Sequence, residues 1–347
     1  MIKEGFLLLS HTPGRTINKS FFNILKRPTS TVGLFFLYAS QRTKTRWPIV
    51  SFPEIPYLEY VLKASTIQLL RVHFSFFLLP VYLFAIGEVP SLNITDALII
   101  FVILHLLIYP ASNGYNSYMD RDEESVGGIL KPMQPTRQLF YVSIALDVIA
   151  LIAGLLISIT FSLCLLAYIL ASRAYSFRGI RLKRYPVIGY LTVILFQGAV
   201  VFFMTYHGSS MDKTYHVPAM AMLASSLLIG GFYPLTQIYQ HQADLKDGVK
   251  TISYLLGYRG TFIFTALIYV AAMGVLAQYF YGSTQEKKLF ILATLMLPVL
   301  VYFFVWAAKV WHNSKEADFR NTMRMNLIAS ICTNLAFFTL LIWKFFE

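Results

Sequence analysis

Long apolar segments recur along the chain from Ile67 onward and are separated by short polar connections. Nine of these segments approach the roughly 20 residues that a membrane-spanning helix needs. They cover residues 67–87, 96–115, 138–157, 159–175, 186–206, 216–238, 260–281, 288–308 and 325–345. The pattern predicts an all-α membrane protein with about nine transmembrane helices.

Residues 1–64 lack this pattern. They are basic, contain five prolines and show no sustained apolar period. We interpret them as an N-terminal extension that is poorly ordered or lies on the cytoplasmic membrane surface, with an over-long gene start as the alternative. Residues 65–347 then form the predicted transmembrane domain.

The composition supports a membrane protein. Hydrophobic residues make up 56% of the 347 residues and charged residues only 13%, whereas soluble domains have roughly 25% charged residues. The net charge of +12 comes from Lys and Arg between apolar segments, where they set orientation and meet anionic lipid, so we expect no nucleic-acid binding. Cys164 and Cys332 lie in apolar segments without metal-site spacing, so we expect neither a disulfide framework nor a zinc site.

Lys and Arg are spread unevenly over the connections. Fifteen lie in the connections after the second, fourth, sixth and eighth segments, and three in those after the first, third, fifth and seventh. The positive-inside rule therefore places the even-numbered connections and the amino terminus in the cytoplasm and the carboxyl terminus outside.

The second apolar segment leads into the polar stretch Asn113–Glu124, which contains four carboxylates in its last five positions. If the helix that enters from Asp96 continues through it, Asn116, Asp120 and Glu124 line one face at positions i, i+4 and i+8. Such carboxylates repel each other unless a cation lies between them, and oxygen ligands with substrate phosphates suit Mg²⁺. The alternative is a solvated acidic loop.

A second polar stretch follows the sixth apolar segment at the same, cytoplasmic side. Gln237, Gln240, Asp244 and Asp247 are spaced to share one helical face. Two such faces four helices apart suggest a pseudo-repeat that closes around one cavity. We therefore expect a site that faces the cytoplasm.

With both stretches in view, residues 65–345 resemble the UbiA superfamily of intramembrane prenyltransferases. Asn116, Asp120 and Glu124 occupy that family's Asn-x3-Asp-x3-Asp motif, with Glu in place of the last Asp. In the second motif, Asp-x3-Asp, Gln240 replaces the first Asp and Asp244 matches the second. This replacement removes a charge and leaves Gln240 as a neutral ligand, or shifts the role to a neighbouring side chain such as Gln237, His241 or Asp247.

The resemblance implies a set of site residues. Asp120 and Asp244 would be catalytic. The Mg²⁺ ligands would come from Asn116, Asp120, Glu124, Gln240, Asp244 and Asp247. The substrate diphosphate would be bound by cations from Arg181, Lys183, Lys131, Arg137 and Arg71, of which Arg181 and Lys183 lie in a loop like the family's Tyr-Ser…Arg-Leu-Lys-Arg segment. For the loop cations, membrane topology alone is the alternative explanation.

A few polar residues interrupt the apolar segments themselves. Asp147 is costly in hydrocarbon and is either a functional residue that faces the bundle interior or a helix-pairing hydrogen bond. His73, near Arg71, either reaches the cavity or extends to the interface. Asn334, Gln197 and His105 are typical of interhelical hydrogen bonding.

The function implied by the resemblance is Mg²⁺-dependent transfer of an isoprenyl group from a prenyl diphosphate to an aromatic, quinone-precursor or other lipid-forming acceptor, in a central cavity open to membrane lipid. We expect a multi-pass protein of the bacterial inner (cytoplasmic) membrane. Three alternatives remain: a secondary transporter, whose acids should lie near the bilayer midplane; a phosphatidyl-type transferase, whose glycine-spaced aspartates are absent; and a non-catalytic family member that assists assembly, given Gln240.

Overall fold

The structure is a computed structural model that describes residues 62–346. The predicted N-terminal extension over residues 1–64 lies almost entirely outside the described residues, so its interpretation stays a prediction.

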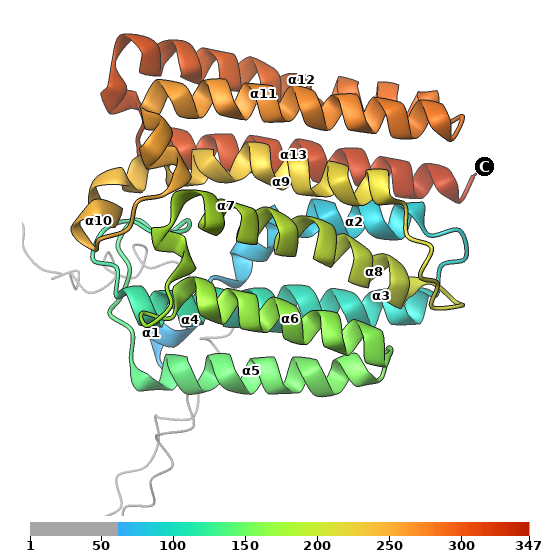
Figure 1. Ribbon diagram of the computed structural model, residues 1–347, viewed down its shortest axis with the longest axis horizontal. Helices are drawn as coiled ribbons and strands as arrows, with labels where there is room; N and C mark the ends of the chain where they lie inside the picture. Colours follow the sequence, from blue (N-terminus) through green and yellow to red (C-terminus); the bar gives the residue numbers. More distant parts are fainter. Residues whose placement is uncertain (1–61, 347) are drawn as a thin grey trace, which may run out of the picture. The chain divides into compact units, whose positions relative to one another are not determined.

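The described residues form helices joined by short connections (Figure 1). The α-helices are α1 (Ala64–Leu70), α2 (Leu79–Glu88), α3 (Ile94–Phe101), α4 (Tyr109–Asp120), α5 (Arg137–Leu155), α6 (Ile159–Ser176), α7 (Pro186–Ile194), α8 (Val201–Ser209), α9 (Ala219–Gln237), α10 (His241–Lys246), α11 (Ile252–Gly282), α12 (Glu286–His312) and α13 (Phe319–Lys344). Between them lie the 3₁₀ helices η2 (Val72–Phe77), η4 (Leu182–Arg184), η6 (Ile238–Gln240) and η7 (Ser314–Glu316) and the π-helical segments η3 (Val102–Ile108) and η5 (Leu195–Val200).

Within residues 62–346, eight helical segments are long and apolar enough to cross a membrane. A ninth span results if the bent pair Ala64–Phe77 and Leu79–Glu88 counts as one, with its two parts meeting at 43°. Arg71, with a φ of 48°, ends α1 in the left-handed conformation and so interrupts this first span. The sequence prediction of about nine spans is confirmed.

Two of the spans contain a π-helical segment. η3 lies inside the span Ile94–Asp120, and η5 lies inside the span Pro186–Ser209. Pro110 lies two residues after the end of η3 and has no N–H to continue the regular hydrogen-bond ladder. π segments are frequent at functional sites, and η5 carries Gln197 to the wall of a cavity described below.

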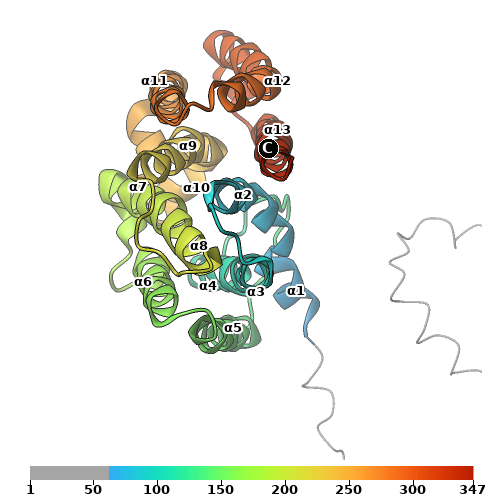
Figure 2. The same ribbon diagram turned by 90° about the vertical axis from the view of Figure 1, so that its right-hand side faces the viewer.

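The helices form two groups that meet at α2 and α9. In Figure 2, α3 to α8 lie together and α11 to α13 lie on the other side of α9, with α2 between the groups. α2 packs against both α8 and α13, and α9 packs against both α11 and η5. A side chain at Gly198 of η5 could not fit, because a Cβ there would lie 2.4 Å from the Cα of Ser226 on α9. Glycine therefore lets the two groups meet backbone to backbone.

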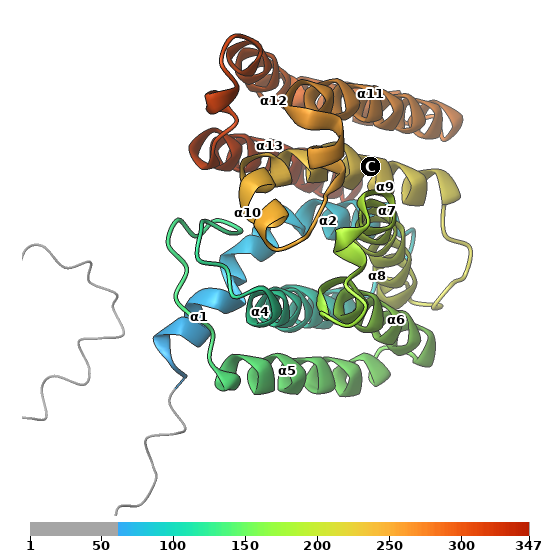
Figure 3. The ribbon, with the colours of Figure 1, turned by 60° about the vertical axis from the view of Figure 1, so that its left-hand side comes forward.

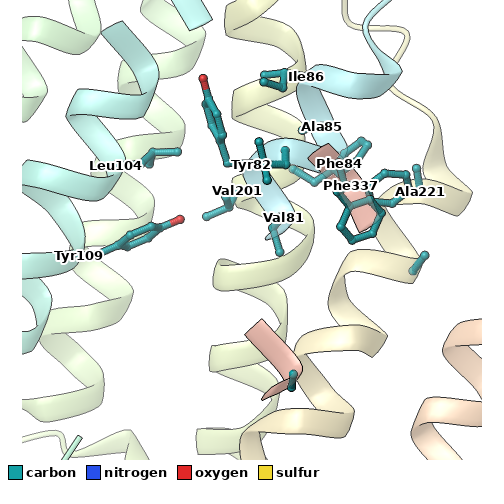
Figure 4. Close-up of a cluster of buried hydrophobic side chains, with 14 of the residues drawn as sticks. Val81, Tyr82, Phe84, Ala85, Ile86, Leu104, Tyr109, Val201, Ala221 and Phe337 are labelled. Atoms are coloured by element: carbon teal, nitrogen blue, oxygen red, sulfur yellow. The ribbon is translucent and has the colours of Figure 1, made fainter. Parts of the chain in front are cut away.

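The contact between the groups is filled by close-packed apolar side chains. Figure 4 shows Val81 and Phe84 of α2 beside Val201 of α8, Ala221 of α9 and Phe337 of α13. In a membrane such contacts hold helices together through van der Waals packing, because lipid is as apolar as the side chains. This packing fixes α4 and α9, which carry the two polar stretches, relative to each other.

The basic connections gather at one end of the bundle. Those after α4, α6, α10 and α12 lie on the left in Figure 1, and the carboxyl terminus lies at the opposite end. The sequence predicts this arrangement, because basic connections that follow every second span must lie on the same side of the membrane. The cytoplasmic location of this end and the assignment to a bacterial inner membrane stay predictions.

Candidate active site

Polar side chains from both groups of helices surround one cavity of about 200 Å³. Figure 3 turns this end of the bundle, which carries α1, α4 and α10, toward the viewer. The charged and amide side chains that line the cavity are Arg71, Asn116, Asp120, Asp122, Lys183, Gln197, Gln237, Gln240, Asp244 and Asn326. Aromatic rings form much of the remaining wall, from Phe74, Phe77, Tyr175, Phe232, Tyr233 and Tyr239. The predicted central cavity is therefore present.

The first polar stretch reaches the cavity at the end of α4. The Asn116 side chain donates to Asp120 Oδ2 at 2.8 Å, one helical turn away, and accepts from Ser176 Oγ on α6 at 3.0 Å. The predicted face of Asn116 and Asp120 is therefore present. It stops there, because Arg121 adopts the left-handed conformation with a φ of 54° and ends α4.

The prediction that Glu124 continues this face is wrong. Beyond α4 the chain turns away, and the exposed Glu124 carboxylate pairs with Lys246 at 2.9 Å on the surface. Asp122 faces the cavity instead. Burial, together with the nearby charge of Asp120, raises the pKa of Asp122 to about 6. The four carboxylates between residues 120 and 124 were visible in the sequence, but only the end of α4 shows which of them face the cavity.

The second polar stretch is also interrupted. α9 ends at Gln237, and the short helices η6 and α10 follow, so that Gln237, Gln240 and Asp244 face the cavity. Asp120, Asp122 and Lys183 are close enough to Asp244 to interact with it electrostatically. The Gln240 amide donates to Ser125 O at 3.3 Å and leaves its carbonyl oxygen available.

Asp247 is not part of the cavity wall, contrary to its prediction as a metal ligand. Its carboxylate pairs with Arg181, and with Arg178 at 3.3 Å. Two arginines already satisfy it, so it serves to hold the loop between α6 and α7 against α10. Arg181 therefore pairs with the Asp247 carboxylate. Its Nη2 also lies 3.5 Å from Oδ1 of Asp120, a residue of the cavity wall.

Two of the five predicted diphosphate-binding cations face the cavity. Arg71 is buried and donates to Asn113 O at 3.2 Å, and Lys183 Nζ lies 2.5 Å from Asp120 Oδ2. Lys131 and Arg137 are exposed and are not part of the cavity wall. The sequence could not separate these groups, because all five lie at the same side of the membrane.

The polar residues within the spans have separate roles. Asp147 of α5 is buried and pairs with Arg173 of α6, so it joins two helices and does not face the cavity. Asn334 donates to Phe76 O at 3.0 Å, whereas Gln197 lines the cavity. His73 is exposed and outside the cavity wall.

The cavity offers buried oxygen atoms to a cation. Asp120 Oδ1, Asp122 Oδ2, Gln237 Oε1 and Asn326 Oδ1 are buried without a hydrogen-bond partner among the described residues. In the part of the chain that the structure describes, no three His, Cys, Asp or Glu side chains come together as a complete metal site. Mg²⁺ suits such a set, because it is usually bound by one or two carboxylates together with substrate phosphates and water.

The fold and cavity define a membrane-embedded helical protein whose carboxylates and cations converge on one cavity. A sequence model of the UbiA prenyltransferase family matches residues 74–328. The chain therefore belongs to this family of prenyl-group transferases.

One curated relative is digeranylgeranylglyceryl phosphate synthase of Methanothrix thermoacetophila. It is 27% identical over 169 residues, which cover 48% of this chain and 62% of that relative. The match thus spans less than two thirds of the relative's length.

Solved structures share the fold. A UbiA homologue from Archaeoglobus fulgidus has a TM-score of 0.59 at 18% identity, over 80% of this chain and 99% of that chain. The same homologue bound to GPP and Mg²⁺ gives the same values. A homologue from Aeropyrum pernix K1 has a TM-score of 0.56 at 19% identity, over 77% of this chain and 97% of that chain.

Proposed function

We propose that this protein transfers an isoprenyl group from a prenyl diphosphate to a lipophilic acceptor inside the membrane, with Mg²⁺ as cofactor. The observation that carries the proposal is the meeting of Asp120, Asp122 and Asp244 with Arg71 and Lys183 around one cavity. The Archaeoglobus homologue, which shares the fold, has been solved with GPP and with DMAPP, in each case together with Mg²⁺.

The charged residues of the cavity have two roles, diphosphate binding and metal binding. Arg71 and Lys183 bind diphosphate oxygens, and charge-assisted bonds of this kind are the stronger ones in proteins. Asp120 and Asp244, aided by Asp122, hold Mg²⁺, which when bound would neutralise charge on the leaving diphosphate. Asp122 takes the place in the cavity that the motif assigns to Glu124, while Gln240 leaves the second motif with the single carboxylate of Asp244.

In the reaction, the bond between prenyl C1 and the diphosphate oxygen breaks, and the diphosphate leaves with the electron pair. A nucleophilic atom of the acceptor forms the new bond to C1 and loses its proton. Fixed positive groups stabilise the leaving group at no reorganisation cost. The aromatic rings of Phe74, Phe77 and Phe232 line the cavity and would stabilise positive charge on the allylic carbon through cation–π attraction.

The acids of this cavity lie at the ends of α4 and in α10, beyond the long apolar stretches, and not at the middle of a span. This placement favours a transferase over the secondary transporter. The acceptor class stays open among aromatic acids, quinone precursors and glyceryl phosphate lipids, of which the last corresponds to the name of the Methanothrix relative.

Purified protein in lipid nanodiscs, given GPP and a panel of these acceptors, tests the proposal. We expect product formation and diphosphate release that stop with EDTA and return with Mg²⁺. Asp120→Asn keeps the size of the side chain and removes its charge, so kcat should fall about 10²–10³-fold. Glu124→Gln, on the surface, is the matched control and should retain the wild-type rate. Turnover that survives EDTA or Asp120→Asn would refute the mechanism.

A further inference from the structure

A second cavity, of about 150 Å³, lies between α2, α9, α11, α12 and α13. We refer to it as the C-terminal cavity. It adjoins the cavity of the candidate active site, which we call the reaction cavity, because Phe77, Ile229 and Phe232 line both. It contains no charged side chain in its wall, and most of its lining is aliphatic or aromatic. Its occupant must therefore be largely apolar.

Five hydroxyl-bearing side chains interrupt this apolar lining. Thr265 Oγ1 and Tyr269 OH are buried and have no hydrogen-bond partner among the described residues. They lie four residues apart on α11 and hence on one face of that helix. Two other hydroxyls in the same wall are satisfied: Thr333 donates to Ala329 O at 2.6 Å, and Ser225 donates to Ala221 O at 2.9 Å.

The two unsatisfied hydroxyls carry an energetic cost. A buried polar group left without a partner has lost its hydrogen bonds to water and gained none in the protein. A hydrocarbon chain in the cavity would not relieve this cost, because it has no atom that can accept or donate a hydrogen bond. A ligand with an oxygen atom near Thr265 and Tyr269 would relieve it.

The cavity also has its own connection to the lipid. Val270 of α11 is 69% exposed and Phe304 of α12 is 62% exposed, and both belong to its wall. The cavity therefore reaches the apolar surface between these two helices. Toward the other side it meets the stacked rings of Phe84 and Phe337, whose centroids are 4.7 Å apart (Figure 4).

We propose that the C-terminal cavity binds a lipophilic ligand that carries an oxygen atom, which hydrogen-bonds to Tyr269 and Thr265. The ligand enters from the bilayer between α11 and α12. If the proposed function is correct, on which this further assignment rests, the ligand is the acceptor substrate. Its reactive atom then points past Phe77 and Phe232 toward the diphosphate. The isoprenyl chain of the donor has no oxygen and does not fit the two hydroxyls.

The test compares two probes of similar shape, 2-decyl-1,4-benzoquinone and decylbenzene, by native mass spectrometry of the full chain released from detergent. We expect the wild type to bind the quinone at least about tenfold more tightly, as a net hydrogen-bonding gain of ~1.4 kcal/mol would give. The double variant Thr265→Val with Tyr269→Phe should lose this preference. Thr333→Val, which removes a satisfied hydroxyl from the same wall, should keep it. Equal binding of both probes by the wild type, or a preference that survives the double substitution, would overturn the proposal.

Two further measurements separate binding from folding and from turnover. Without ligand, the double variant should unfold at or above the wild-type temperature, because it loses two unsatisfied groups. A lower temperature would show that the hydroxyls support the fold and would count against a ligand role. In the transfer assay, the double variant should raise the KM for the acceptor about tenfold and leave the KM for GPP unchanged. If the wild type transfers no prenyl group, the proposed function fails, while the probe preference still decides the binding site.

Discussion

Lys183, in the short helix η4, lies 2.5 Å from Asp120 at the end of α4. The two residues come from opposite ends of a connection that includes α5 and α6, and both face the reaction cavity. The contact pairs a proposed diphosphate-binding cation with a proposed metal-binding carboxylate. Each charge neutralises the other, so neither is buried alone.

Replacing Lys183 with Met should weaken donor binding. The substitution keeps an unbranched side chain and removes the ammonium group. Hydrogen bonds to charged groups are worth about 1.5–3 kcal/mol, so the KM for GPP should rise roughly 10- to 100-fold. Arg184→Met, at the exposed neighbouring position, is the control and should leave the KM unchanged. An unaltered KM in Lys183→Met would remove this residue from the diphosphate site.

Asp122→Asn tests the carboxylate that replaces Glu124 in the cavity. Loss of its charge should lower kcat about a hundredfold. This is the lower end of the range observed when one preorganised electrostatic group is removed from an active site. The adjacent Glu123 is exposed, and Glu123→Gln should retain the wild-type rate. Rates measured at saturating GPP across a series of Mg²⁺ concentrations would check this. Equal rates for the two variants would show that Asp122 only lines the wall.

Gln240→Asp would restore the carboxylate usual in the family's second motif. We expect the half-maximal Mg²⁺ concentration to fall, because a further negative charge faces the cavity. Loss of the hydrogen bond from the Gln240 side-chain amide to Ser125 O should cost about 1 kcal/mol of stability, which thermal unfolding would detect. Gln242→Asp, on the exposed side of α10, adds the same charge away from the cavity. A higher Mg²⁺ requirement in Gln240→Asp alone would contradict the metal role of this position.

The pair of Asp147 and Arg173 should matter for stability and not for chemistry. Asp147→Leu leaves the half-buried Arg173 without its partner, and breaking buried ion pairs costs about 3–5 kcal/mol. The double variant with Arg173→Leu should recover much of this loss, because two apolar residues replace two charges. Unfolding in detergent measures both. A well-folded double variant that is inactive would show instead that Asp147 takes part in function.

The predicted orientation can be checked with reporter fusions. A phosphatase that is active only outside the cytoplasm should work when fused after Glu347. The same reporter fused after Asn313, between α12 and α13, should be inactive, while a fluorescent protein that folds in the cytoplasm should fluoresce there. The reverse pattern would invert the topology and place the reaction cavity outside.

The sequence by itself determined the spans, their alternating basic connections and the two polar stretches. These features depend on the length of each apolar run and on the charges between the runs, and both can be read from residues that are adjacent in the chain. It also indicated Asn116 and Asp120 on one face, because a single helical turn separates them. It could not place the end of α4, which a left-handed residue at Arg121 decides.

Only the tertiary structure decided which charged groups face the cavity. Asp247 and Glu124 are drawn away by Arg181 and Lys246, and such pairings join segments far apart in the chain. Likewise, Thr265 and Tyr269 look like ordinary polar residues within an apolar span. Their unsatisfied hydroxyls become visible only once α9, α12 and α13 enclose them, because hydrogen bonding depends on which atoms the packing brings near and not on the order of residues.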